Sequence, residues 1–336
     1  MKILVTGAAG FIGSNFVDYV INNSDHEVIG LDILNYASDM KNLENIIDKS
    51  NRFNFIQGDI SDDQLILSID HEIVVNFAAE THVTRSINNS QSFIYNDVLC
   101  TDGLLRSSLY NKKLKQFIHI STSEVYGTCN GKDMSEEHHL NPLSPYAAAK
   151  CGADRLAYSY AATYRLPVLI IRPFNNYGPR QHLEKVIPRF ITSTILGKPV
   201  TLHGKGLAKR DFIFVEDTCE ALLKIIDSKK IFNNEVFNLG SEDCFSVSEI
   251  AQKIISRNNT KQANIVYETD RPGQVDKHIC NMKKFQKEFN WLPKTQFDSG
   301  LSLTFEWYKK NKQWWENKLS MQKIRIVLPD GRVIHH

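Results

Sequence analysis

A tyrosine and a lysine four residues apart carry the clearest sign of chemistry in the sequence. Tyr146 and Lys150 stand at the start of a segment with helical spacing, which places both side chains on one face. Because a nearby ammonium stabilises a phenolate, we expect Lys150 to lower the pKa of Tyr146, so that Tyr146 can act as a general base near neutral pH. Such pairs also arise by chance on ordinary helices, so this pair is evidence for catalysis only together with other motifs of an active site.

Three polar residues follow an apolar run at residues 116–121. Thr122, Ser123 and Glu124 come directly after this run. Open parallel sheets present ligands at the carboxyl ends of their strands, so we expect these side chains at the edge of an active site. A carboxylate there is a candidate base for an acidic C–H proton, which gives Glu124 a possible role of its own.

A glycine-rich turn follows the first apolar run, at residues 2–6. The turn reads GAAGFIG and places Gly7, Gly10 and Gly13 immediately before a helical segment. Glycines permit a tight turn and let the backbone approach a pyrophosphate, while the helix N-terminus attracts its charge. Asp32 ends the next strand, where a carboxylate suits the ribose hydroxyls and repels a 2′-phosphate. The sequence therefore predicts a bound dinucleotide and favours NAD over NADP.

Short apolar runs alternate with longer helical segments through the first half of the chain, a rhythm typical of βαβ units. We predict an α/β fold: a Rossmann-type doubly wound parallel sheet with a smaller C-terminal substrate-binding lobe. The NAD-binding domain spans 1–178, a mainly substrate-binding lobe that can re-enter the sheet spans 179–322, and a hairpin or tail spans 323–336. The predicted strands are 2–6, 27–31, 54–57, 73–77, 116–121, 168–172, 200–203, 211–215 and 235–239. The predicted helices are 11–21, 88–110, 145–164, 186–196, 216–226, 247–255 and 297–308.

Composition excludes several other classes of protein. The 336 residues carry 40 Lys and Arg against 38 Asp and Glu, so the basic excess expected of a nucleic-acid-binding protein is missing. No apolar stretch approaches the roughly 20 residues of a membrane helix, and the first residues do not resemble a signal peptide. The six cysteines lack metal-ligand spacing and read as reduced thiols, so we expect a cytoplasmic protein without a metal.

Taken together, these segments resemble the extended short-chain dehydrogenase/reductases, specifically the nucleotide-sugar branch with its 4,6-dehydratases, 4-epimerases and UDP-glucuronate decarboxylases. The resemblance covers nearly the whole chain. It implies that Thr122, Tyr146 and Lys150 form the catalytic triad, that the substrate is a nucleotide sugar, and that the helical segments 88–110 and 145–164 form a homodimer interface. The segments that carry it are TGAAGFIG, NFAAETHVTRSI, STSEVYG, SPYAAAK, RPFNNYGPR, KRDFIFVED and DRPGQVDKH.

The resemblance also implies contacts for the cofactor and the substrate. The sugar and its diphosphate would lie near His82, Asn176 and Lys185, with Arg210 and Arg271 holding the diphosphate. Three of these have a plainer interpretation: His82 as a hydrogen-bonded core or loop histidine, Asn176 as part of a turn, and Arg210 as one half of a surface ion pair with Asp211. The residues implied for NAD are Gly7, Gly10, Phe11, Ile12, Gly13, Asp32, Asp59, Ile60, Ala78, Ala79, Tyr146 and Lys150.

Glu124 favours dehydration within this family. A 4-epimerase needs only oxidation and reduction at C4, whereas a 4,6-dehydratase must also remove the C5 proton and expel the C6 hydroxyl. Many glucose dehydratases of the family carry Asp-Glu where this chain has Ser123-Glu124, so either Glu124 takes and gives the proton or another acid serves. Both retention and inversion at C5 are compatible with these residues.

The segments RPFNNYGPRQ and DRPGQVDKH most resemble those of the dehydratases that act on UDP-N-acetylglucosamine. The resemblance implies this sugar as the leading substrate, for deoxysugar and glycan biosynthesis. The alternatives are a dTDP- or UDP-glucose 4,6-dehydratase, a UDP-glucuronate decarboxylase and a 4-epimerase. A catalytically silent dinucleotide sensor is disfavoured by the intact set of Thr122, Tyr146 and Lys150.

Overall fold

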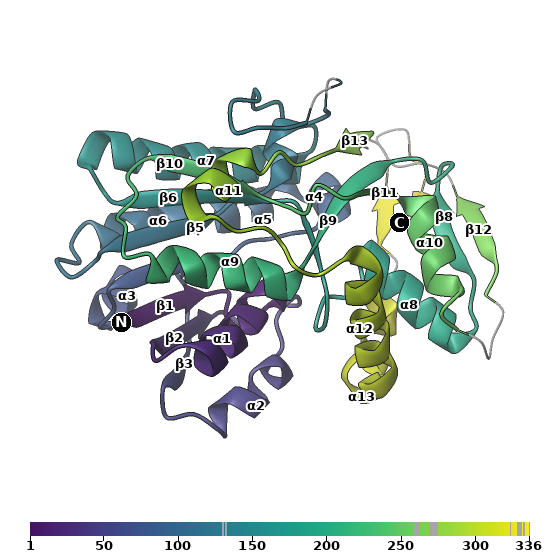
Figure 1. Cartoon of the computed structure of the whole chain (residues 1–336), viewed down its shortest axis with the longest axis horizontal. Helices are drawn as coiled ribbons and strands as arrows, with labels where there is room; N and C mark the ends of the chain where they lie inside the picture. The colour runs from purple at the N-terminus through teal and green to yellow at the C-terminus, as the bar shows by residue number, and fades with distance from the viewer. Residues whose placement is uncertain are drawn as a thin grey trace.

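A seven-stranded sheet forms the centre of the computed structural model (Figure 1). The model describes residues 1–129, 131, 133–258, 263–268, 275–322, 324–327, 331 and 333–335. All neighbouring strands of this sheet are parallel, in the order β10-β6-β5-β4-β1-β2-β3, which confirms the predicted fold class. The strands are β1 (Lys2–Thr6), β2 (Glu27–Asp32), β3 (Phe53–Gln57), β4 (Ile73–Asn76), β5 (Gln116–Ile120), β6 (Val168–Pro173) and β10 (Glu235–Leu239).

The strand order reverses at β1, which lies between β4 and β2. The chain builds β2 and β3 on one side of β1 and then crosses to build β4, β5 and β6 on the other. Doubly wound sheets bind ligands in the crevice at such a switch point, beyond the carboxyl ends of the strands. The glycine turn after β1 and the polar residues after β5 both lie at this edge of the sheet.

Helices cover both faces of the sheet and bury its apolar side chains. On one face α1 (Phe11–Asn23), α9 (Val215–Asp227) and α11 (Lys283–Phe289) pack over a core that includes Phe16 and Leu222. On the other, α3 (Asp63–Ser68), α6 (Cys100–Ser108) and α7 (Pro145–Tyr164) pack over Leu4, Phe117 and neighbouring residues. The helices predicted at 11–21 and 145–164 are confirmed.

The predicted helix 88–110 is confirmed to within two residues at each end, except that its middle is π-helical. The chain forms α5 (Ser90–Phe93), the π-helical segment η2 (Ile94–Leu99) and α6 without a break, and the separate α4 (Val83–Asn88) precedes them. Asn89 separates α4 from α5 with non-helical backbone angles and caps α5, because its side chain accepts a hydrogen bond from the backbone N–H of Ser92 (3.4 Å). Asparagine favours such capping positions because its side chain competes with the helix for backbone hydrogen bonds. The π-helical segment that follows carries the buried Asp97.

The second half of the chain builds a separate lobe, on the right in Figure 1, and also returns to the sheet. Its core includes Tyr177, Phe190, Leu202 and Phe297. Between the lobe's segments, α9 packs against α1 and β10 pairs with β6, so the chain does re-enter the sheet. A substrate-binding role for the lobe stays a prediction. The lobe contains β7 (Asn175–Tyr177), α8 (Val186–Leu196), β8 (Val200–His203), β9 (Lys209–Phe214), β11 (Cys244–Ser246), α10 (Val247–Ile255), β12 (Ile265–Glu268), β13 (Lys277–His278), α12 (Phe297–Lys310) and α13 (Lys312–Trp315).

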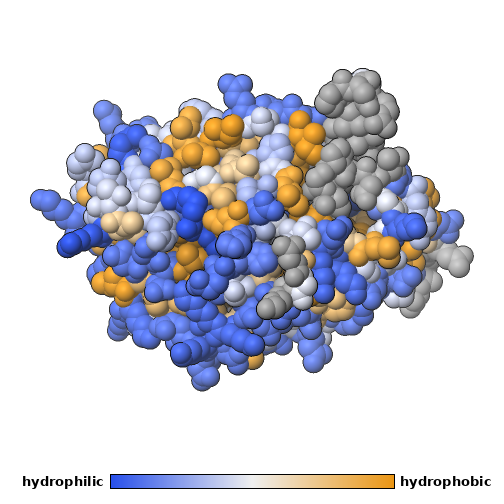
Figure 2. All heavy atoms as spheres, turned by 90° about the horizontal axis from the view of Figure 1, so that it is seen from above, coloured by the Kyte–Doolittle hydropathy of each residue, from blue (hydrophilic) through white to orange (hydrophobic). Residues whose placement is uncertain are grey.

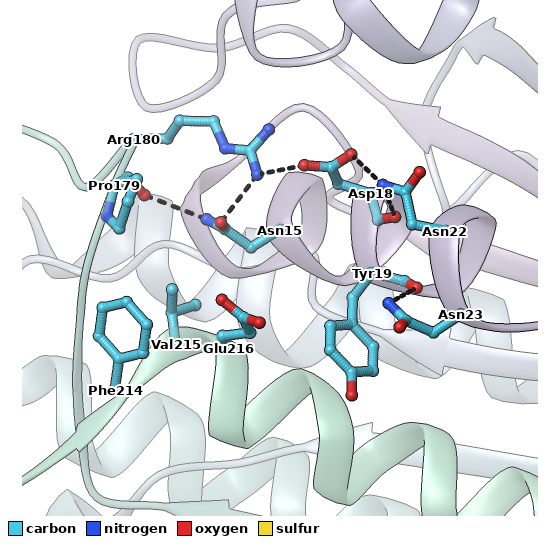
Figure 3. Close-up of a pocket in the computed structure, with 10 residues that line it drawn as sticks. All are labelled: Asn15, Asp18, Tyr19, Asn22, Asn23, Pro179, Arg180, Phe214, Val215 and Glu216. Atoms are coloured by element: carbon cyan, nitrogen blue, oxygen red, sulfur yellow. Dashed lines mark hydrogen bonds and ion pairs between the residues drawn. The ribbon is translucent and has the colours of Figure 1, made fainter. Parts of the chain in front are cut away.

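Arg180 fastens the start of the lobe to the first helix of the sheet domain (Figure 3). Its guanidinium donates to Asn15 Oδ1 (2.8 Å) and Asp18 Oδ2 (3.1 Å), and Asn15 donates to the carbonyl of Pro179 (3.1 Å). All three contacts lie along α1, the helix that begins at the glycine turn. These hydrogen bonds hold residues 179 and 180, which connect the sheet domain to the lobe, against α1.

The last helices also reach back to the sheet domain. Trp314 donates from Nε1 to Asn42 Oδ1 (2.9 Å), and Lys318 forms an ion pair with Asp39. Beyond them, β14 pairs antiparallel with β15, and residues 328–330 and 332 between these strands lie outside the described residues. The remaining elements are η1 (Met40–Asn42), α2 (Glu44–Ile47), η3 (Ser123–Tyr126), η4 (Glu316–Gln322), β14 (Arg325–Val327) and β15 (Val333–His335).

The surface mixes polar residues with several apolar areas, as the face in Figure 2 shows. Exposed apolar side chains lie on η2 and α7, among them Tyr95, Leu99 and Tyr158, on the segments predicted to form a homodimer. That interface stays a prediction. Within the described ranges, no helix is long and apolar enough to cross a membrane, and no cluster of His, Cys, Asp or Glu could hold a metal ion.

Candidate active site

The glycine turn after β1 leaves no room for larger residues. Gly7 has a positive φ of 66°, and a Cβ at this position would lie 2.8 Å from the backbone nitrogen of Ala78. A Cβ on Gly13 would lie 2.2 Å from the carbonyl oxygen of Gly7. The first turn of α1, which contains Phe11 and Ile12, carries neither an acidic residue nor a side-chain cap. Its N–H groups and positive dipole end can therefore receive a phosphate.

Asp32 is held in place beside this turn. Its Oδ2 accepts a hydrogen bond from the backbone N–H of Ala9 (3.0 Å), and its Oδ1 accepts one from that of Leu34 (2.8 Å). Each carboxylate oxygen has a second lone pair, so two further donors, such as ribose hydroxyls, can bind. The glycine cradle and this fixed carboxylate together fit NAD.

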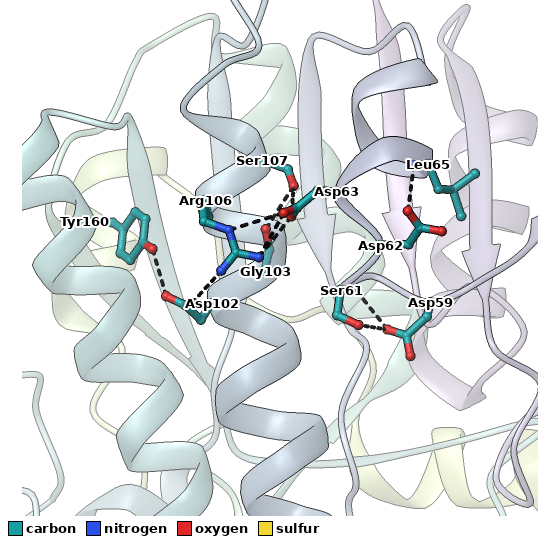
Figure 4. Close-up of polar contacts among 10 residues, drawn as sticks. All are labelled: Asp59, Ser61, Asp62, Asp63, Leu65, Asp102, Gly103, Arg106, Ser107 and Tyr160. Atoms are coloured by element: carbon teal, nitrogen blue, oxygen red, sulfur yellow. Dashed lines mark hydrogen bonds and ion pairs between the residues drawn. The ribbon is translucent and has the colours of Figure 1, made fainter.

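The loops after β3 and β4 complete the same edge. Asp59 turns its carboxylate onto its own loop, where Oδ1 accepts from the backbone N–H and the hydroxyl of Ser61, both at 2.8 Å (Figure 4). Ile60 is buried beside it. Ala78 donates its N–H to Thr6 Oγ1 (3.3 Å), and Ala79 is half-buried. Adenine contacts from Asp59 and Ile60, and dinucleotide contacts from Ala78 and Ala79, stay predictions.

The residues of the predicted triad meet where β5 ends and α7 begins. Thr122 caps η3, with Oγ1 accepting from the backbone N–H of Glu124 (3.2 Å). A side-chain hydrogen bond joins Thr122 to the buried Tyr146. Tyr146 lies in the first turn of α7, which Ser144 caps and Pro145 begins, as helix N-termini favour. The two capped termini thus bring the hydroxyl groups of Thr122 and Tyr146 together.

The expected effect of Lys150 on Tyr146 is wrong for this arrangement. Lys150 donates from Nζ to the carbonyl of Ile120 (2.8 Å), and burial lowers its pKa. The pKa of Tyr146 is raised, chiefly because the phenol is buried and also because the carboxylates of Asp97 and Glu124, when ionised, disfavour a further negative charge nearby. The Thr122 hydrogen bond opposes this rise. Lys150 therefore stands close to the site with its ammonium held by a strand carbonyl.

Asp97 is a buried acid that the sequence interpretation missed. Its Oδ1 accepts from the backbone N–H of Glu80 (2.6 Å), and its Oδ2 has no hydrogen-bond partner in the described part of the chain. Burial raises the pKa of Asp97 to about 7, although the charge of Lys150 opposes the rise. Nothing in the sequence marked this residue, because it lies in a run that reads as one helix.

Glu124 interacts electrostatically with both Tyr146 and Arg210, and its side chain is 18% exposed. Arg210 is buried and donates to the carbonyl of Lys209 (2.9 Å), while the carboxylate of Asp211 accepts backbone hydrogen bonds from Ser241 and its neighbours. The surface ion pair considered for Arg210 is therefore wrong, and this arginine faces the site.

His82 and Lys185, two of the predicted sugar contacts, lie close together. His82 is buried immediately before α4, and Lys185 donates from Nζ to the carbonyl of the adjacent Thr81 (2.5 Å). Asn176 is engaged inside the fold, since it accepts from Thr218 Oγ1 (2.7 Å) and donates to the carbonyl of Phe174. Roles of these residues in sugar binding stay predictions.

Arg271 lies outside the described residues. Next to His82 and Lys185, a charged cluster was also missed by sequence reasoning. Arg85 donates to Glu184 Oε2 (3.0 Å) and lies 4.0 Å from the centre of the Tyr36 ring.

Comparison with known proteins identifies the family. A profile described as GDP-mannose 4,6 dehydratase matches residues 4–304. The chain belongs to this family. Low-salt glycan biosynthesis protein Agl12 of Haloferax volcanii is 41% identical, over 92% of this chain and 98% of its own length. The dTDP-glucose 4,6-dehydratase of Streptomyces niveus is 37% identical, over 94% of this chain and 95% of its own length.

A solved structure shares the fold closely. DesIV, a dTDP-glucose 4,6-dehydratase from Streptomyces venezuelae with NAD and TYD bound, superposes with a TM-score of 0.90 at 34% identity, over 94% of this chain and 99% of that one. The predicted membership of the nucleotide-sugar 4,6-dehydratase branch of the extended short-chain dehydrogenase/reductases is confirmed. The predictions of a hydro-lyase and of NAD as its cofactor are confirmed with it.

His278 is a further residue of the candidate active site that sequence reasoning missed. It ends β13 and lies 3.4 Å from Ser123 Oγ and 3.9 Å from Glu124 Oε1, measured from Nδ1. The histidine was visible at the end of DRPGQVDKH, but only the pairing of β13 with β9 brings it to the active-site edge.

Proposed function

We propose that this chain converts a nucleotide-linked hexose to its 4-keto-6-deoxy derivative by removing water across C5 and C6. The observation that carries the proposal is a carboxylate, Glu124, two residues beyond Thr122 and electrostatically coupled to Tyr146. Oxidation of an alcohol by NAD needs only one base, which the hydrogen-bonded hydroxyl groups of Thr122 and Tyr146 can supply. A second base beside them suits a reaction that also removes a proton from carbon.

Each group has a distinct role in this scheme. Gly7, Gly13 and Asp32 would hold NAD, which when bound supplies the acceptor for the C4 hydrogen and later returns that hydrogen to C6. Tyr146, as the phenolate, takes the proton of the C4 hydroxyl, with Thr122 hydrogen-bonded to the phenol. Burial raises the pKa of Tyr146, so the positive charge of bound NAD would have to favour the phenolate. The ketone at C4 then acidifies the C5 proton, Glu124 removes it, and the C6 hydroxyl leaves as water. As the hydrogen returns to C6, C5 takes a proton from solvent, and Tyr146 releases the proton of the C4 hydroxyl to solvent.

UDP-N-acetylglucosamine is the first substrate we propose, on the strength of the RPFNNYGPRQ and DRPGQVDKH segments. A second candidate is dTDP-glucose, which is supported by the dTDP-glucose 4,6-dehydratases described above. Arg210, Lys185 and Arg271 are cations suited to the diphosphate that both substrates share. We also propose that the protein works as a homodimer in the cytoplasm.

A substrate panel tests the reaction. The purified protein would be mixed separately with UDP-N-acetylglucosamine, dTDP-glucose, UDP-glucose and UDP-glucuronate, and the products analysed by NMR. We expect a 4-keto-6-deoxy sugar from one of the first three, and the ratio of kcat/KM values ranks the substrates. Formation of a C4 epimer alone, or of carbon dioxide from UDP-glucuronate, would assign the chain to another activity of the family.

Glu124→Gln tests the role of the carboxylate. Glutamine keeps the size and hydrogen bonding of glutamate but cannot take a proton from C5. With the best substrate, the reduced cofactor should accumulate, seen by its absorbance, while no 6-deoxy product forms and no solvent deuterium enters C5. Glu137→Gln, on an exposed position outside the site, is the matched control. Product formation by Glu124→Gln at the parent rate would show that another group is the base.

A further inference from the structure

His278 is completely buried at the active-site edge, although 154 residues separate it from Glu124 in the sequence. It ends β13, in register with Arg210 of β9. The ring of Phe174 packs against the imidazole, with ring centres 6.3 Å apart at 75°. The imidazole is therefore held in one orientation, next to two residues that follow β5.

The hydrogen bonds of the ring fix where its proton lies. His278 Nε2 is 2.6 Å from the carbonyl oxygen of Gly127. A carbonyl oxygen can only accept, so Nε2 carries a hydrogen and, in the neutral ring, Nδ1 carries a lone pair. Nδ1 faces Ser123 Oγ at 3.4 Å and Glu124 Oε1 at 3.9 Å. One nitrogen thus stands within reach of both a carboxylate and a hydroxyl.

Gly127 makes this arrangement possible. Its φ is 73°, and a Cβ there would lie 2.2 Å from the carbonyl oxygen of Asn141. The residue ends η3, so the segment that contributes Ser123 and Glu124 also contributes the carbonyl that orients His278. Ser123 and Glu124 from η3 and His278 from β13 are therefore positioned together.

We propose that His278 carries a proton from Glu124 to Ser123, and that Ser123 delivers a proton to the departing C6 oxygen. This inference rests on the proposed dehydration. A serine hydroxyl is too weak an acid to protonate a leaving group unless its own proton is replaced at the same time. His278 is the neighbour that can replace it, and in this role it is a positioning and relay residue rather than one that touches the substrate.

The steps balance. Glu124 takes the C5 proton, and the C–H electrons form the enolate of the 4-keto sugar. Protonated Glu124 passes that proton to Nδ1 of His278, which keeps its hydrogen on Nε2. The C6–O bond breaks, the departing oxygen takes the hydroxyl proton of Ser123, and Ser123 takes the Nδ1 proton. Water has left, and Glu124, His278 and Ser123 are back in their starting states.

The electrostatics around the ring support a neutral starting state. Burial lowers the pKa of His278, and the positive charge of Arg210 and the ring of His138 act in the same direction, while Glu124 raises it. A histidine that starts neutral has its Nδ1 lone pair free of a proton and can accept one from a carboxylic acid. The carboxylate next to it stabilises the imidazolium that forms briefly.

A substrate whose leaving group needs no proton tests the relay. The parent protein and His278→Gln would be compared on the active nucleotide hexose and on its 6-deoxy-6-fluoro analogue, which expels fluoride. Glutamine can still donate from Nε2 to the carbonyl of Gly127, but it has no titratable nitrogen. We expect His278→Gln to slow water loss by about 10²-fold or more, the size of a general-acid effect, and to slow fluoride release by no more than about five-fold. Ser123→Ala should show the same split.

The controls separate the possible failures. His71→Asn replaces another buried histidine that bonds a backbone carbonyl, and it should slow neither reaction. Glu124→Gln should slow both reactions, because both need the C5 proton removed. If His278→Gln slows both alike, the residue is merely structural, and if it slows neither, Glu124 protonates the leaving oxygen itself. Either result overturns the relay.

The proposed function is judged by the parent protein alone: if it converts neither the hexose nor the fluoro analogue, the dehydration itself is refuted. If His278→Gln does not fold, as judged by circular dichroism, the comparison is made with Ser123→Ala. Equal slowing of both substrates by that variant, or slowing of neither, likewise overturns the relay.

Discussion

Replacing Asp97 with asparagine should stabilise the protein, and the gain should grow as the pH rises. Asp97 is buried in η2, and its pKa is raised from the usual 3.8 to about 7. Between these two values the unfolded chain has released the proton while the folded chain keeps it, so stability falls as the pH rises. Asparagine keeps an oxygen that can accept from the N–H of Glu80 and never ionises.

The size of the effect follows from the two pKa values. Each pKa unit corresponds to about 1.4 kcal/mol, so ionising Asp97 in the folded protein lowers the free energy of unfolding by about 4 kcal/mol at about pH 8. At about pH 5 the unfolded chain, with a pKa of 3.8, has released the proton while the folded protein still keeps it. The free energy of unfolding is then lowered by about 1.5 kcal/mol. The advantage of Asp97→Asn should therefore be about 2.5 kcal/mol larger at the higher pH.

Urea unfolding of both proteins at the two pH values measures this difference. All other titrating groups are shared and cancel in the comparison. Asp48→Asn, at an exposed position, is the matched control and should not reproduce the pH-dependent gain. A gain for Asp97→Asn that is equal at both pH values, or larger at low pH, would refute the raised pKa and with it the assignment of Asp97 as a buried, protonated neighbour of Lys150.

Two further predictions concern the triad and the cofactor. Tyr146→Phe removes the base for the C4 hydroxyl and should lower kcat by about 10²–10⁴-fold without loss of bound NAD, and a near-normal rate would remove Tyr146 from the mechanism. Gly13→Ala puts a methyl group 2.2 Å from the carbonyl oxygen of Gly7. We expect the parent protein to retain NAD through gel filtration and this variant to lose it, and an equal cofactor content in the two proteins would contradict the fit of NAD to this turn.

The sequence interpretation succeeded where neighbours in the chain are also neighbours in the fold. The parallel strands are buried on both faces and read as short apolar runs, which is why their positions were predictable to within one residue at each end. Thr122, Ser123 and Glu124 follow one strand, and Tyr146 and Lys150 share one helical turn, so their proximity was predictable as well.

The failures lie where tertiary structure decides. The apolar periodicity at 88–110 predicted a helix, but it did not predict that residues 94–99 are π-helical. Asp97 and His278 enter the site only through tertiary packing and the β13–β9 pairing, which leave no mark on local sequence. The direction of the Lys150 ammonium depends on a strand carbonyl, which no spacing rule can supply.

The interleaving of the two parts of the chain constrains how such a protein can acquire new specificity. A single crossover after β7, which would attach another lobe by recombination, would also replace α9, β10 and α11, whose side chains fill the sheet domain's own core. In the hybrid, the foreign segment would have to pack both within its own lobe and, through α9, β10 and α11, against the sheet domain. Inheritance of a foreign lobe as one unit is therefore unfavourable. On the proposed substrate-binding role of the lobe, substitutions within β9 and β13 are the accessible route to a new substrate.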